Sequence, residues 1–63
     1  MARLTLTQRA YVAERVRNLI FSEFITTTDI PHDLALEAAT EAANEAARIL
    51  KLTLEERGVE VEG

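Results

Sequence analysis

Three side chains near the middle of the chain are of types that bind metal ions: Asp29, His32 and Asp33. A metal site needs three or four converging ligands, but carboxylates are also common at the start of a helix, where they act as caps. We interpret both aspartates in that second way, and we expect neither a metal ion nor a cofactor. With one histidine and no cysteine, the chain has no thiolate or histidine-rich zinc site.

Catalytic chemistry finds little support in the sequence. Ser22 is a potential nucleophile by type, but no plausible base lies near it, and His32 adjoins a helix start. Both glycines stand at the C-terminal end, and 63 residues leave little room for a ligand pocket. We therefore predict that the protein is not an enzyme and that it has no catalytic residue.

A ladder of carboxylates recurs every four residues in the second half of the chain. Like charges at this spacing on a helix destabilise it by a few tenths of a kcal/mol per pair. The ladder is interpreted either as an acidic surface that binds a basic partner or imitates DNA, or as a solvated face relieved by Arg48 and Lys51. We favour the solvated face, because runs of charge usually mark one. The ladder comprises Asp33, Glu37, Glu41 and Glu45.

The segment from Glu37 to Arg48 repeats one pattern three times: Glu-Ala-Ala-Thr, Glu-Ala-Ala-Asn and Glu-Ala-Ala-Arg. Alanine and glutamate are strong helix formers, so we predict a helix over residues 31–57 with Gly58 as its left-handed C-cap. Paired alanines on each turn also form a shallow groove. Another helix can approach closely there, and Ala42 and Ala46 should be intolerant of larger side chains.

An earlier helix is predicted over residues 6–25. A threonine at position 5 or 7 can cap it, and Thr5 with Gln8 fits the capping-box pattern. β-Branched residues and Pro31 then end it. The apolar stripe of this helix consists of Val12, Ala13, Val16, Leu19, Ile20 and Phe24.

These elements predict an all-α fold, a two-helix antiparallel hairpin that forms one domain over residues 1–63 with a frayed tail at 59–63. The second helix is the longer one, so its last two turns need cover from Met1 to Leu6 or from a second subunit. It also carries two apolar seams, and a helix with a single neighbour needs only one. We therefore expect the hairpin to pair with its copy as a dimeric four-helix bundle. The residues predicted at interfaces are Tyr11, Phe21, Ile25, Ala43, Ala47, Leu50 and Leu54.

The net charge of −4 is unevenly distributed, because residues 31–63 are strongly acidic. This balance opposes nucleic-acid binding, which depends on phosphate neutralisation. The N-terminal residues lack the apolar run of a signal peptide, and the longest bulky apolar run is three residues. We expect a cytoplasmic protein without a membrane partner.

The segment Arg3-Leu4-Thr5-Leu6-Thr7 alternates like a strand and precedes two helices. This order resembles that of ribbon–helix–helix repressors. The resemblance implies N-terminal strands that pair and read the major groove, with Arg3, Thr5 and Thr7 facing DNA. The long second helix and the acidic charge depart from that family.

The sequence therefore predicts a small non-enzymatic protein that binds other proteins or regulates them and acts as a homodimer. Its partners would be a second copy of the chain and another protein. Two alternatives stay open: a DNA-binding regulator of the ribbon–helix–helix type and a structural subunit of a larger helical assembly.

Overall fold

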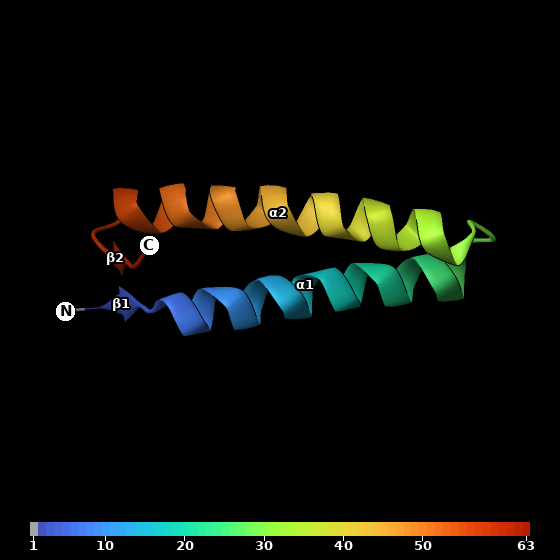
Figure 1. Ribbon diagram of the computed structural model, residues 1–63. Coiled ribbons are helices and arrows are strands. Elements are labelled where there is room, and N and C mark those ends of the chain that lie inside the picture. Colours follow the sequence, from blue (N-terminus) through green and yellow to red (C-terminus); the bar gives the residue numbers. More distant parts are fainter. Residues whose placement is uncertain (1) are drawn as a thin grey trace.

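Two long helices make up most of the protein. The computed structural model describes residues 2–63, with α1 at Leu6–Thr27 and α2 at His32–Glu56. The two helices lie side by side and run in opposite directions (Figure 1). The predicted helical hairpin is thus confirmed, and it is elongated, measuring 44 × 19 × 16 Å.

Helix α1 begins at the predicted capping box. The Gln8 backbone N–H donates to the Thr5 hydroxyl at 3.1 Å, and the Thr5 N–H donates to the Gln8 side chain at 2.9 Å. The helix continues to Thr27, two residues beyond the predicted end. In this last turn the Thr26 and Thr27 hydroxyls donate to main-chain carbonyls one turn earlier, so these side chains find hydrogen-bond partners within the helix.

Helix α2 ends in the predicted glycine cap. Gly58 has a φ of 87°, a left-handed conformation that favours glycine. The Gly58 N–H donates to the Glu55 carbonyl at 3.1 Å and the Val59 N–H to the Leu54 carbonyl at 2.9 Å. This pair of bonds is the Schellman arrangement, and it turns the chain back at the end of the helix.

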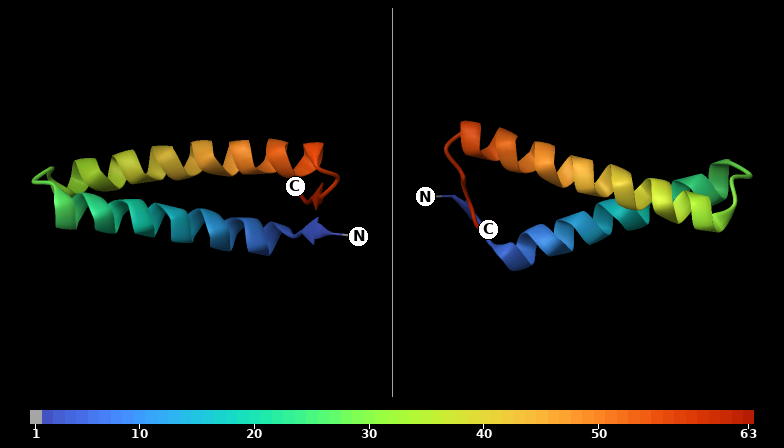
Figure 2. Two further views of the ribbon diagram at one scale, coloured as in Figure 1. Left: turned by 180° about the vertical axis from the view of Figure 1, so that it is seen from behind. Right: turned by 45° about the horizontal axis from the view of Figure 1, so that its top comes forward.

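The chain beyond this cap does not form the frayed tail that we predicted. Strand β2, Glu60–Val61, pairs in parallel with β1, Arg3–Leu4. The Glu60 N–H donates to the Ala2 carbonyl at 3.1 Å, and the Glu62 N–H donates to the Leu4 carbonyl at 3.0 Å. The helices diverge toward this end, and the strands lie across the opening (Figure 2).

The core is small. Within residues 2–63 the fully buried hydrophobic side chains are Ala35, Ala39 and Ala43, and no large side chain is fully buried. The chain exposes 4804 Å², whereas a compact folded protein of 7.0 kDa exposes about 4,000 Å². Its radius of gyration of 13.6 Å likewise exceeds the roughly 11 Å of a compact chain of this length. A single hairpin therefore leaves much apolar surface in contact with solvent.

Candidate interaction surface

The line of buried alanines sets the distance between the two helices. Ala35, Ala39 and Ala43 follow one another at intervals of four residues, so they stay on the side of α2 that faces α1. Without larger side chains between them, the helix backbones can approach closely. Our prediction of which alanines form the tight contact is only partly met. Ala42 is exposed and Ala46 is half-buried.

A second apolar side of α2 has no neighbour within the chain. It combines large residues near both ends of the helix with alanines between them. Together with Leu19 of α1 we call it the open face. Its large side chains are between 47% and 65% exposed. The members of the open face are Leu19, Leu34, Ala38, Ala42, Ile49 and Leu52.

Phe24 connects the two helices across the open face. It lines one surface hollow together with Leu19 and Ile20 of α1. It also lines a second hollow with Leu34 and Ala38 of α2. The exposed apolar residues at the loop end are therefore connected across both helices through Phe24, and the carboxylates of Glu23, Glu37 and Glu41 border the two hollows.

The other side of the hairpin is polar at its centre. A hollow between the helices there is lined by Glu14 and Arg17 of α1 and by Thr40 and Asn44 of α2. The Nε atom of Arg17 is buried and has no hydrogen-bond partner among the described residues. Because burying unpaired polar groups is costly, this side is poorly suited to close apolar packing.

Three of the predicted interface residues instead face the interior of the hairpin. Ala43, Ala47 and Leu50 line a small cavity between the helices, together with Leu4 of β1 and Val12 of α1. Leu4 thus covers part of the end of α2, which is one of the two kinds of cover that we considered for it. These residues already have neighbours within one chain, although Leu50 remains 42% exposed.

The remaining predicted interface residues do not gather into one patch. Tyr11 is exposed, with the Arg15 guanidinium 5.8 Å from its ring centroid. Phe21 is half-buried, and its ring meets that of His32 edge-on at 6.2 Å. The last two are half-buried: Ile25 and Leu54.

The carboxylate ladder is exposed along its whole length. Arg48 forms an ion pair with Glu45, and this hydrogen bond lowers the pKa of the Glu45 carboxyl. The pairing supplies the local relief that we expected from Arg48. Exposure and pairing both fit the solvated-face interpretation.

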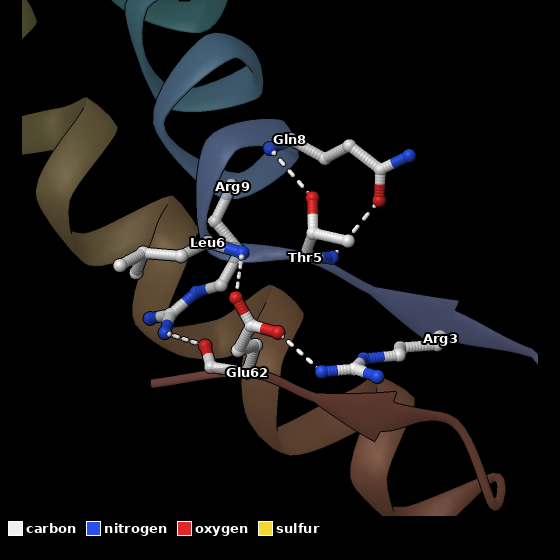
Figure 3. Close-up of polar contacts among 6 residues, drawn as sticks. All are labelled: Arg3, Thr5, Leu6, Gln8, Arg9 and Glu62. Carbon is white, nitrogen blue, oxygen red and sulfur yellow. Dashed lines mark hydrogen bonds and ion pairs between the residues drawn. The ribbon is translucent and has the colours of Figure 1, made fainter.

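The two ends of the chain are joined through Glu62. Its carboxylate accepts the Leu6 N–H at 3.1 Å and pairs with the Arg3 guanidinium, while its main-chain carbonyl accepts from Arg9 (Figure 3). The first turn of α1 contains no acidic residue. Glu62 therefore supplies, from the far end of the chain, the negative charge that a helix N-terminus favours. We call these contacts, with the β1–β2 pair, the terminal clasp.

The terminal clasp should depend on pH. The Leu6 N–H, and then Arg3, lower the pKa of the Glu62 carboxyl below its ordinary value of 4.5. A carboxyl whose pKa is lowered by folding adds stability above its unfolded pKa, and this stability is lost as the pH falls through its folded pKa. We expect the clasp to be intact at neutral pH and to loosen below pH 4.5.

Amide hydrogen exchange at Leu6 measures this opening directly, after correction for the intrinsic pH dependence of exchange. In Glu62→Gln the Leu6 amide should be less protected at neutral pH than in the wild type. Its protection should also stay constant over the acidic pH range in which the Glu62 carboxylate of the wild type becomes protonated. Equal Leu6 protection in the two proteins at neutral pH would show that the carboxylate does not hold the clasp.

The clasp also gives β1 a different neighbour from the one that the ribbon–helix–helix resemblance implies. Here β1 pairs with β2 of the same chain, not with a second N-terminal strand. Arg3 is engaged by Glu62, and the Thr5 hydroxyl caps α1. Two of the three side chains that the resemblance assigns to DNA thus have partners within the chain.

The described residues form neither a metal site nor a membrane-spanning helix. Among residues 2–63, no three His, Asp or Glu side chains gather where they could hold a metal ion. In the same part of the chain, neither helix combines the length and apolar character needed to cross a membrane. Comparisons with protein-family models, with curated proteins and with solved structures found no match.

Proposed function

We propose that this protein is a small non-enzymatic interaction or regulatory protein that acts as a homodimer, built as a four-helix bundle from two hairpins. One observation carries the proposal: the fully buried hydrophobic residues of the described chain are three alanines, while large apolar side chains remain exposed on the open face. Contiguous exposed apolar surface on a small protein commonly marks an interface.

The energetics of the small core support association. A chain of this size obtains little net stability from its own core, and no disulfide is present to add to it. Burying an aliphatic side chain stabilises by about 1.5–3 kcal/mol relative to exposing it. If a second copy covers the large residues of the open face, the stabilisation of the dimer is therefore several times that from one such side chain.

A regulatory role requires a surface that the dimer leaves accessible. Tyr11 is exposed, is not a member of the open face, and carries an aromatic ring of the kind enriched at binding hot spots. We assign contact with another protein to this region. A pull-down that loses its captured protein on Tyr11→Ala, while the dimer persists, tests this assignment.

Self-association itself is directly measurable. Sedimentation equilibrium at micromolar concentration should give about twice the monomer mass of 7.0 kDa. Because folding and association are then coupled by mass action, the melting temperature should rise with protein concentration. A monomer that unfolds cooperatively at a concentration-independent temperature would contradict the proposal.

A further inference from the structure

We infer that the open face is the contact between the two copies and that they pack on it antiparallel, with the loop end of one hairpin over the terminal end of the other. This inference rests on the proposed homodimer and specifies its surface and orientation. Three properties of the described residues support it: the size of the face, its shape and the distribution of charge along the hairpin.

The size of the face suits a stable dimer. The hairpin is 44 Å long and 19 Å wide, so one whole side, of which the open face is the apolar part, has an outline of about 800 Å². This is the area that each partner buries in an interface of standard size. A second copy of the same length covers this side from end to end.

The shape of the face is nearly symmetric about Ala42. Leu34 lies eight residues before Ala42, and Ile49 lies seven residues after it. At 1.5 Å per residue, these side chains are about 12 Å and 10 Å from the centre along the helix. A two-fold axis through Ala42 therefore sets Leu34 of one copy beside Ile49 of the other. Ala38 and Ala42 at the centre let the two α2 helices approach closely, as the alanine line does within one chain.

Charge determines the orientation. The loop half of the hairpin, residues 17–44, contains one arginine and five carboxylates, a balance of −4, so the rest of the chain is neutral. A parallel dimer would place the two acidic halves together, whereas an antiparallel dimer places each beside a neutral half. Glu45 interrupts the open face between Ala42 and Ile49, and its ion pair with Arg48 offsets its charge there. Like charges brought together at an interface oppose association.

Single-cysteine variants can test both the surface and the orientation, since the native chain has no cysteine. Under mild oxidation Ala42→Cys should form disulfide-linked dimers, because the two-fold axis brings both copies of this residue together. Leu34→Cys and Ile49→Cys should each remain largely unlinked alone and should form linked dimers when mixed. Asn44→Cys is the matched control, since it lies on the polar side of the same helix.

Sedimentation of each variant under reducing conditions shows whether it still dimerises, so that a failure to link can be interpreted. Efficient linking of Leu34→Cys with itself would overturn the antiparallel orientation. Linking of Asn44→Cys in preference to Ala42→Cys, or no linking in the mixture of dimeric Leu34→Cys and Ile49→Cys, would overturn the choice of face. If the protein remains dimeric, any of these results contradicts only the proposed surface or orientation and not the proposed homodimer. A wild-type chain that is monomeric would contradict the homodimer itself.

Discussion

Ala39→Leu should lower the melting temperature by about 5–20 °C, following from an overpacking cost of about 1–3 kcal/mol. Ala39 is 0% exposed and lies at the centre of the alanine line that faces α1. A leucine there would force α1 and α2 apart along their closest contact. Thermal unfolding followed by far-UV circular dichroism measures the change.

Asn44→Leu provides the control for this substitution. Asn44 is exposed on the same helix and borders the polar hollow, outside the alanine line, so an added leucine has room and should alter stability by no more than about 0.5 kcal/mol. If Ala39→Leu melted at the wild-type temperature, the two helices would have room between them, and the alanine line would not set their spacing.

The parts of the fold that the sequence predicted well depend on local interactions. The capping box joins Thr5 to Gln8, and the glycine cap joins Val59 to Leu54. In each case the partners are at most five residues apart, so the residue types and their spacing carry the information. The alanine repeat predicted the long second helix for the same reason.

The terminal clasp could not be predicted in this way. It pairs Arg3 with Glu60 across almost the whole chain, through strands of only two residues each. The residues from Arg3 to Thr7 do alternate like a strand, but alternation in so short a segment does not identify the segment with which it pairs. The role of Glu62 depends on the hairpin bringing the C-terminal end of α2 close to the start of α1.

The face of α2 that packs against α1 could not be predicted from the sequence either. Two seams were predicted on α2, but alanine occurs in both, and its small side chain does not distinguish a helix contact from a solvated position. One predicted seam contains Ala43 with Leu36, Ala47, Leu50 and Leu54, and the other contains Ala35 with Ala38, Ala42, Ile49 and Leu52. The structure buries Ala35 from one seam and Ala43 from the other, with Ala39 between them. The residues left outside this line form much of the open face, so the candidate interface became definable only once α1 was placed.

Ile49→Asp should weaken self-association more than any other single change that we consider. Ile49 is 51% exposed in the hairpin, so its cover in the dimer contributes about half of the 1.5–3 kcal/mol of a fully buried aliphatic side chain. In a two-fold dimer each substitution occurs twice, so the total loss is at least about 1.5 kcal/mol. This corresponds to a Kd about 10-fold higher, before the cost of placing carboxylates in the interface is added. Sedimentation equilibrium over a range of concentrations measures the Kd.

Leu36→Asp separates loss of the interface from loss of the helix. Leu36 lies on α2 outside the open face and is 45% exposed, close to the 51% of Ile49. Both variants introduce the same residue into the same helix, so they share the cost of aspartate in a helix interior. They differ in the face that they alter. We therefore expect Leu36→Asp to keep its Kd within a few-fold of the wild type. Equal weakening by the two variants would mean that the negative charge or the helix itself, and not the open face, controls association.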